Sequence, residues 1–186
     1  PIGDTPPVLL ALDATVIAQS RGGERAIPID EFFIDYRKTA MKPGEILARI
    51  EVKRPAAKAK QAAYKVSKRR ELDISAVCAA VVVEVNDQDL ITAARVAFGG
   101  MAATPSRAPS VEAALVGHPF TQGTFETASE AVAQDFTPID DHRCSAWYRG
   151  TVARNLVAAF YEETRNEDAP RLPDRPSQTC VVEVSP

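Results

Sequence analysis

The stretch YKVSKRRELDISAV, residues 64–77, decides how the rest of the chain is interpreted. Its charged residues fall within ten positions, and the nearly all-apolar run 78–83 follows directly. Long basic side chains are costly to order, so such a stretch passes sharply from solvent into a core and forms a rim where ligands can bind. A solvated turn before a core strand is the simpler interpretation. The charged residues are Lys65, Lys68, Arg69, Arg70, Glu71 and Asp73.

Length and composition limit the class of protein. A chain of 186 residues with 45% hydrophobic residues suits one domain, or one domain with a fragment of a neighbour. The net charge of −3 argues against a nucleic-acid binder. The sequence has no run of eighteen apolar residues and no basic-then-apolar leader, so we expect neither a membrane span nor secretion.

The three cysteines, Cys78, Cys144 and Cys180, are scattered and form no C-x-x-C pair. This spacing favours neither a disulfide framework nor a zinc or iron–sulfur site, and it fits a protein of the reducing cytoplasm. Cys78 lies in an apolar run and is predicted to be a small core residue. His118 and His142 are predicted to lie in surface loops.

The first 55 residues have the pattern of β-structure. Residues 8–19 and 25–30 flank an Arg-Gly-Gly-Glu turn, which predicts a hairpin whose second arm Pro28 keeps short or at an edge. Residues 31–36 suggest a short helical turn or a bend. Residues 43–52 alternate as a half-buried strand does, but Leu47 falls on the polar side. We therefore expect Leu47 to face a neighbouring element or a flat ligand.

A subdomain boundary is predicted near residue 56, and the fold class is predicted to be α+β. Strands are expected at 61–67, 76–85 and 91–98, with a hairpin turn at 86–89. A sheet of three antiparallel strands needs helices over one face.

Three helices are expected after the sheet. Ser110 is the expected N-cap of 111–116 before Gly117, and Thr124 that of a second helix. The third helix spans 145–164 and places Arg149 within its apolar stripe. Arg149 is then either buried with a carboxylate or placed at a subunit interface. The stripes are Phe125, Ala128, Val132 and Phe136 in the second helix, and Tyr148, Val152, Leu156 and Phe160 in the third.

Residues 166–186 are rich in Pro, Asp, Arg and Ser and predict a flexible tail. Within it, 180–184 alternate like a strand with nothing local to pair with, so they are expected either to be disordered or to dock on a partner. Elsewhere the sequence offers no Gly-x-Ser-x-Gly elbow, no metal-ligand cluster and no predicted catalytic residue. Neither Gly22-Gly23 nor Gly99-Gly100 precedes a convincing helix, so the chain offers no obvious cradle for a diphosphate.

Four short stretches carry a resemblance to a known family. The pattern YKxSxRRExDI at 64–74 resembles the flavin-side segment in the FAD-binding small subunit of the xanthine dehydrogenase family of molybdenum hydroxylases. PIGD at 1–4, YRKT at 36–39 followed by GEIL at 44–47, and AFGGMA at 97–102 agree in the same order. With the last helix they cover residues 1–165.

The resemblance implies a division of the chain and a larger assembly. Residues 1–55 would be a C-terminal remnant of a PCMH-type FAD-binding domain, and 56–165 a domain like the C-terminal domain of CO dehydrogenase flavoprotein. Electrons would pass from iron–sulfur centres via FAD to NAD during purine hydroxylation. The iron–sulfur and molybdopterin groups would lie on other domains or subunits, including a large molybdopterin-binding subunit.

The resemblance also implies roles for individual residues. Asp4, Leu47 and Lys65 would contact FAD, and the loop 67–74, with Asp73 and Ile74, would lie against the flavin where NAD approaches. A cation at the flavin edge favours the anionic reduced ring, and an aliphatic side chain over the ring excludes water. Leu72 stands where some members have an acid, which would favour NAD over oxygen as acceptor.

In the family, the segments that hold the FAD diphosphate lie upstream of the PIGD motif. We therefore expect this chain to be a piece of a longer polypeptide that binds FAD weakly or not at all when isolated. Two alternatives stay open: a non-catalytic module that holds other subunits together, and the flavoprotein of a related hydroxylase acting on another heterocycle or on carbon monoxide.

Overall fold

A four-stranded antiparallel sheet in the order β6-β7-β8-β9 forms the larger layer of the computed structural model, which describes residues 3–69 and 73–165. Its strands are β6 (Lys60–Val66), β7 (Val77–Val85), β8 (Ile91–Gly99) and β9 (Ser106–Arg107). The central strand β7 is buried along its first seven residues. The α+β class and the three expected strands are confirmed, and the two-residue strand β9 adds a fourth.

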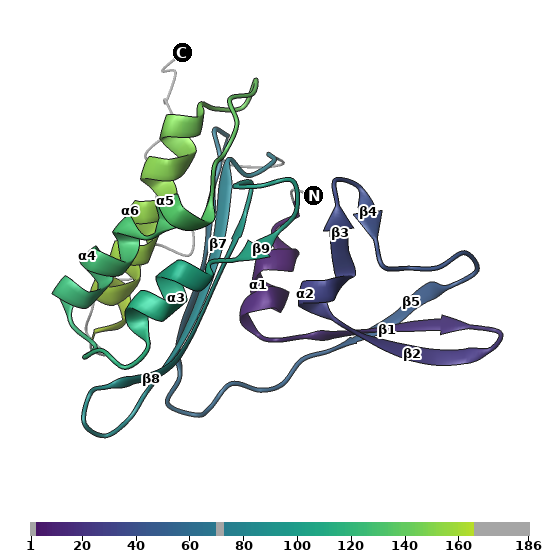
Figure 1. Ribbon diagram of the computed structural model, residues 1–186, viewed down its shortest axis with the longest axis horizontal. Helices are drawn as coiled ribbons and strands as arrows, with labels where there is room; N and C mark the ends of the chain where they lie inside the picture. Colours follow the sequence, from purple (N-terminus) through teal and green to yellow (C-terminus); the bar gives the residue numbers. More distant parts are fainter. Residues whose placement is uncertain (1–2, 70–72, 166–186) are drawn as a thin grey trace, which may run out of the picture.

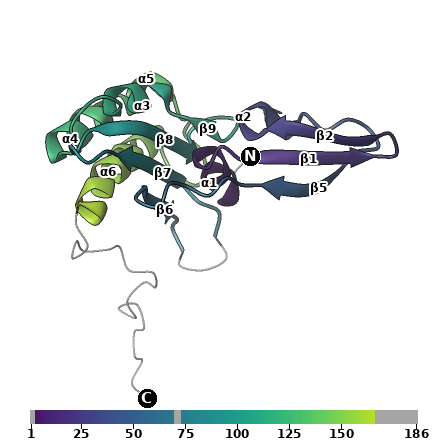
Figure 2. The same cartoon turned by 90° about the horizontal axis from the view of Figure 1, so that it is seen from below.

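Helices cover one face of this sheet, as Figures 1 and 2 show. They are α3 (Pro109–Leu115), α4 (Gln122–Glu130), α5 (Val132–Asp135) and α6 (Ala146–Thr164). Side chains alternate across a strand, so Val77, Ala79, Val81 and Val83 of β7 face the helices and belong to the main core. Within the described residues, no helix is long and apolar enough to cross a membrane.

The predicted helical stripes are largely buried, but the helix boundaries differ from the prediction. Phe125, Ala128, Val132 and Phe136 are all buried, yet the chain breaks at Ala131 into α4 and α5. The stripe of α6 is buried at Leu156 and Phe160, whereas Tyr148 is 40% exposed.

Both predicted N-caps were wrong. Helix α3 already begins at Pro109, because proline is tolerated in the first turn, and its N-cap is Ala108. The side chain of Asp135 accepts hydrogen bonds from the amides of Ser110 and Val111, at 3.0 and 3.2 Å, in place of a local cap. Helix α4 is capped by Thr121.

The opposite face of the larger sheet is covered in part by α1 (Thr5–Ala11). Ala11 packs against Ala80 and Val82 of β7. We predicted residues 8–19 as one strand arm, and its first part was wrong. The prolines at the start of α1 suit a helix N-terminus, and the helix is kept by the burial of Leu10 and Ala11.

The remaining strands form an arm that projects from the larger sheet (Figures 1 and 2). Strands β1 (Thr15–Ser20), β2 (Gly23–Pro28) and β5 (Ile46–Glu51) pair in the order β2-β1-β5, which confirms the predicted hairpin. The short helix α2 (Ile29–Phe32) leads to a small hairpin of β3 (Phe33–Asp35) and β4 (Lys38–Thr39). The expected half-burial of β5 was wrong, because all six residues are exposed.

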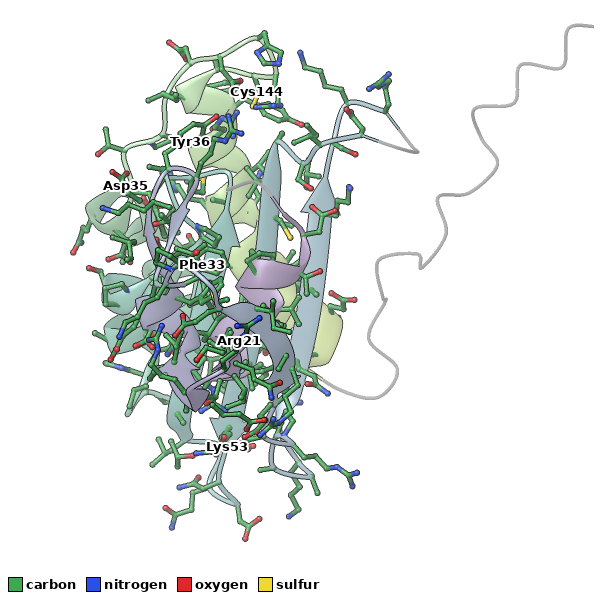
Figure 3. All side chains as sticks on the ribbon, turned by 90° about the vertical axis from the view of Figure 1, so that its right-hand side faces the viewer. Arg21, Phe33, Asp35, Tyr36, Lys53 and Cys144 are labelled. Carbon is green, nitrogen blue, oxygen red and sulfur yellow. The ribbon has the colours of Figure 1, made fainter. Side chains whose placement is uncertain are left out.

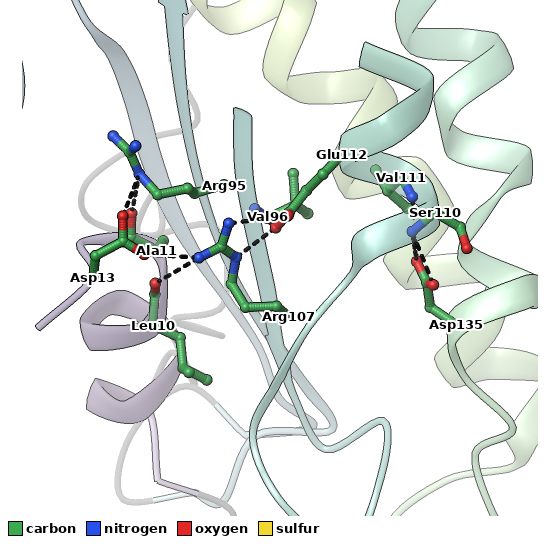
Figure 4. Close-up of polar contacts among 10 residues, drawn as sticks. All are labelled: Leu10, Ala11, Asp13, Arg95, Val96, Arg107, Ser110, Val111, Glu112 and Asp135. Carbon is green, nitrogen blue, oxygen red and sulfur yellow. Dashed lines mark hydrogen bonds and ion pairs between the residues drawn. The ribbon is translucent and has the colours of Figure 1, made fainter. Parts of the chain in front are cut away.

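Two arginines join α1 to the larger sheet (Figure 4). Arg95 donates to the carbonyl of Ala11 at 3.0 Å and Arg107 to that of Leu10 at 3.4 Å, near the C-terminal end of α1. Both arginines also pair with Asp13, at 3.5 and 2.8 Å. Cations at a helix C-terminus interact favourably with the helix dipole. This cluster therefore fixes the end of α1, from which the chain continues into β1 of the arm.

Candidate functional site

The segment 64–77 forms the predicted rim. Lys65 and Lys68 are exposed, and Ile74 is 49% exposed, while Ser75 and Val77 are fully buried. The chain therefore passes from solvent to core within a few residues. Arg70, Glu71 and Leu72 lie outside the described residues, so the interpretation placed on Leu72 stays a prediction.

A polar cluster brings together residues that are distant in sequence. Lys65 Nζ donates to Asp4 Oδ2 at 2.6 Å, across 61 positions, and Ser75 Oγ donates to Asp4 Oδ1. Burial would raise the pKa of Asp4, but the hydrogen bonds from Lys65 and Ser75, together with the charge of Lys65, lower it overall. Asp4 is therefore a carboxylate at neutral pH, and it directs the ammonium of Lys65.

Cys78 lies directly behind this cluster. Its thiol donates to the backbone carbonyl of Asp4 at 3.4 Å and is buried, as predicted for a core residue. Burial, with a smaller contribution from the charge of Asp4, raises the pKa of Cys78 to about 11. Cys78 is therefore a neutral thiol that packs the site.

Asp73 shapes the turn that presents Ile74. Its carboxylate accepts from the backbone amide of Arg69 at 2.8 Å, from the Arg69 guanidinium at 3.3 Å and from the amide of Ile74 at 3.0 Å. The Arg69 amide has the largest effect on the pKa of Asp73, which is lowered despite some burial. Asp73 thus fixes the turn, and the Ile74 side chain stays exposed beside it.

A mostly apolar hollow of about 780 Å³ adjoins the cluster, and Gly3 and Ile74, the neighbours of Asp4 and Ser75, both line it. We call it the apolar hollow. Three chain segments form most of its wall: Ile74, residues 100–103 after β8, and the segment 137–143 before α6. Tyr36, 62% exposed in the turn between β3 and β4, completes the lining. Figure 3 shows Tyr36 at the same end of the molecule as Cys144, near the 137–143 segment.

The charged groups of the hollow centre on Asp141. It pairs with Arg149 Nη2 at 2.9 Å and with Arg143 Nη1 at 3.3 Å, and it accepts from the amides of Arg143 and Cys144. Slight burial would raise the pKa of Asp141, but the two amides and Arg149 lower it to about 2. The side chain of Arg149 is 2% exposed, which confirms the predicted buried ion pair.

The structure brings only part of the predicted FAD set together. Asp4, Lys65, Asp73 and Ile74 lie on one rim. Leu47 lies on β5 opposite Ala18, is 46% exposed and lines neither this hollow nor the smaller one between α1 and the sheet. The expectation that Leu47 and Lys65 flank one ring therefore stays a prediction.

Other predictions concern residues away from the rim. Gly22 lies in the β1–β2 turn and Gly23 begins β2, while Gly99 ends β8 and Gly100 follows it, so neither pair begins a helix. His118 and His142 are exposed, as expected. Among residues 3–69 and 73–165, no group of three His, Cys, Asp or Glu side chains could hold a metal ion.

Sequence reasoning missed Ser75, Tyr36 and Asp141 as site residues. Tyr36 begins the YRKT motif and Ser75 follows the motif at 64–74 directly, and either position could have marked the residue. Asp141 lies in an irregular segment without periodicity, so no local signal indicated it.

Two family models match the chain. One is described as the CO dehydrogenase flavoprotein C-terminal domain and matches residues 62–164; the other is described as the FAD binding domain in molybdopterin dehydrogenase and matches residues 1–55. The first spans more than half of the chain.

Similar proteins and structures agree with these matches. Xanthine dehydrogenase of Emericella nidulans is 34% identical over 187 residues, 99% of this chain and 14% of that protein. Glyceraldehyde dehydrogenase medium chain of Sulfolobus acidocaldarius is 31% identical over 163 residues, 88% of this chain and 57% of that protein. The structure of carbon monoxide dehydrogenase from Hydrogenophaga pseudoflava, which lacks the Mo-pyranopterin moiety, has a TM-score of 0.79 at 28% identity, and the match covers 84% of this chain and 54% of that one. The chain thus spans less than two thirds of each.

Proposed function

The chain belongs to the flavoprotein family of the molybdenum hydroxylases, and on that premise we propose that it is the FAD-binding portion of a xanthine dehydrogenase-like oxidoreductase. When bound, FAD supplies the electron transfer from iron–sulfur centres to NAD that accompanies purine hydroxylation. The proposed partners are a molybdopterin-binding large subunit and an iron–sulfur domain, and the proposed compartment is the cytoplasm. The residues of this chain would position the flavin and exclude water from it.

The Asp4–Lys65–Ser75 cluster is the observation that carries this proposal. An ammonium group has three donors, and Lys65 directs one of them to Asp4. Asp4 thereby fixes the cation, while Ser75 fixes Asp4 from the buried side. A cation held in this way can face the electron-rich edge of a flavin and favour its anionic reduced form.

Ile74 and Leu47 would supply the apolar contacts. The turn closed by Asp73 presents Ile74 directly beside the cluster. Leu47 lies on β5 of the arm, where its side chain is exposed, and it would contact the ring from there.

NAD is the proposed acceptor, and the apolar hollow beside Ile74 supports this choice. Its wall is mostly apolar and includes Tyr36, which suits stacking of a flat base. Arg143 lines the same hollow and supplies a cation suited to an anionic dinucleotide. Turnover of the intact enzyme with NAD and with oxygen tests this part; a preference for oxygen would contradict it.

The test of the FAD site is Lys65→Met in the intact enzyme, with Lys58→Met as the matched control. Lys58 is 84% exposed and pairs with Asp87 away from the rim. We expect Lys65→Met to lower the flavin potential by about 30 mV, equivalent to about 1.4 kcal/mol for a two-electron couple, because a cation no longer favours the anionic reduced ring. Spectroelectrochemical titration measures the potential, and an unchanged value with full flavin content would refute the role.

A non-catalytic assembly module is the second candidate, and exposed apolar residues favour it. Ile46, Val52 and Trp147 are 65%, 46% and 75% exposed. Loss of subunit assembly in Lys65→Met, with normal flavin properties, would support this function instead. A third candidate is a related hydroxylase, to which the similarity to carbon monoxide dehydrogenase gives weight; substrate profiling of the intact enzyme separates it from the first.

A further inference from the structure

Three walls of the apolar hollow meet at one buried side chain. Ile74 stands two residues before Ala76, residues 101–103 follow Gly100, and the segment 137–143 contains Asp141. Arg149 itself lines the hollow, and it bonds to a group within or next to each of these segments. Its Nη1 donates to the carbonyls of Ala76 at 2.7 Å and Gly100 at 2.5 Å, and its Nη2 donates to Asp141 at 2.9 Å.

The carbonyls of Ala76 and Gly100 lie beyond the last paired residues of β7 and β8, so they need a hydrogen-bond donor from outside the sheet. The pairing of β7 with β8 ends at Cys78 opposite Gly99, so Ala76 and Gly100 lie beyond it. The backbone comes very close here: a Cβ added to Gly100, which has φ +83°, would lie 2.4 Å from the Ala76 carbonyl oxygen. Two carbonyl oxygens held side by side repel each other, and a guanidinium placed between them removes that repulsion.

Burial of this arginine is costly, so its position calls for an explanation beyond stability. Taking a guanidinium out of water costs several kcal/mol, and an apolar side chain of similar volume is often as stable at such a site. The Arg149 Nε atom is buried and finds no acceptor among the described residues, which adds to the cost. What an apolar residue could not do is tie three separate chain segments to one another.

We propose that Arg149 is a positioning residue that sets the shape of the apolar hollow and thereby its affinity for the electron acceptor. The inference rests on the proposed function, in which NAD binds beside Ile74. Because the planar fork reaches both carbonyls and the carboxylate at once, a lysine at this position keeps the charge but cannot keep the three ties. Geometry and charge can therefore be separated by substitution.

The experiment compares Arg149→Lys and Arg149→Met in the intact enzyme, with Arg154→Met as the matched control. Arg154 lies on the same helix, is 45% exposed and pairs with Glu130 away from the hollow. We expect both Arg149 variants to raise the KM for NAD and the Kd for NADH about tenfold, because displaced walls no longer fit the dinucleotide. The kcat, the flavin content and the rate of flavin reduction by substrate should stay within about twofold of the parent. The control should match the parent in every respect.

Gly100→Ala provides a second route to the same displacement. Its new methyl group would lie 2.4 Å from the Ala76 carbonyl oxygen and 3.1 Å from Arg149 Nη1, so it would displace this contact without removing the charge of Arg149. We expect the same rise in Kd for NADH, and this variant serves if the Arg149 variants fail to assemble.

The outcomes separate the inference from the proposed function. If the parent enzyme binds FAD and NADH and the variants bind NADH equally well, the inference is wrong and the proposed function stands. If flavin content falls in step with thermal stability, Arg149 has only a structural role and the inference is also wrong. If the parent enzyme holds no flavin, the proposed function fails, and the inference fails with it.

Discussion

The two larger sheets of this protein differ in how far they bury their apolar residues. The β6-β7-β8-β9 sheet buries its apolar residues between helices on one side and α1 on the other. The arm buries Val16 and Ala18 in β1 but leaves all of β5 in solvent. The lesson is that an alternating pattern specifies a strand, whereas burial depends on whether another layer reaches it.

Truncation of a large side chain should give the largest difference in unfolding free energy between the β6-β7-β8-β9 sheet and the arm. Phe98 is 1% exposed and meets Phe136 edge to face at 5.5 Å, so Phe98→Ala should lower the free energy of unfolding by about 4 kcal/mol. Ile46→Ala in the arm should change it by less than about 0.5 kcal/mol, because the side chain is 65% exposed. Urea denaturation measures both; similar losses would mean that the arm is buried in solution.

Two glycines with the same backbone geometry give the second contrast. Gly44 before β5 and Gly100 after β8 both have φ +83°, but a Cβ meets nothing within 4 Å at Gly44 and backbone at 2.4 Å at Gly100. Gly44→Ala should cost about 1 kcal/mol for the left-handed conformation alone. Gly100→Ala should cost about 3 kcal/mol, since overpacking adds to it. Equal costs in urea denaturation would show that the Gly100 turn can relax.

Two arginines give the third contrast: Arg107 in β9, next to the end of α1, and Arg49 in β5 of the arm. Arg107 pairs through Nε with Glu112 at 2.5 Å and through Nη1 with Asp13 at 2.8 Å, and its side chain is 27% exposed. Arg107→Gln should therefore lower the free energy of unfolding by about 2 kcal/mol. Arg49 in β5 pairs with Glu24 and Glu51 while half exposed, and Arg49→Gln should leave stability unchanged within error. Raising the salt concentration should shrink the difference only slightly, because Arg107 is partly shielded; complete loss in salt would contradict this.

The helix-covered sheet was the more predictable of the two regions. Its strands and buried stripes followed from period-two and period-3.6 patterns, and these residues indeed pack against each other. The Ser110 cap was wrong because the acceptor for its amide comes from Asp135, 25 positions away, and the Thr124 cap because Thr121, three residues earlier, accepts from the amide of Thr124. The helix α1 was missed because its Val and Leu residues fit either period, and only its packing on β7 and β8 decides between them.

The smallest contrast is in how Asp141, which precedes α6, and Glu45, which precedes β5 of the arm, affect stability at low pH. The pKa values of Asp141 and Glu45 are both lowered to about 2, Asp141 mainly by two amides and Arg149 against some burial, and Glu45 mainly by Arg25. A lowered folded pKa gives stability that is present above the ordinary pKa, 3.8 for Asp141 and 4.5 for Glu45, and that is lost as the pH falls toward 2. Asp141→Asn should therefore flatten the stability profile between pH 4 and 2.

Glu45→Gln should flatten the same profile less, because its partner Arg25 is 34% exposed and solvent weakens the pair. Thermal unfolding at each pH measures both profiles. A larger effect from Glu45 would indicate that the arm, and not the helix-covered sheet, limits acid stability.

The sequence by itself determined the strands, the buried helical stripes and the abrupt change from charged to buried residues at 64–77, because these depend on neighbours along the chain. Only the tertiary structure decided that Asp4 meets Lys65 and that Arg149 meets Ala76 and Gly100, across 61, 73 and 49 positions. Local periodicity selects a conformation and a face. It does not say which distant group will satisfy a charge, because that depends on how the completed elements pack.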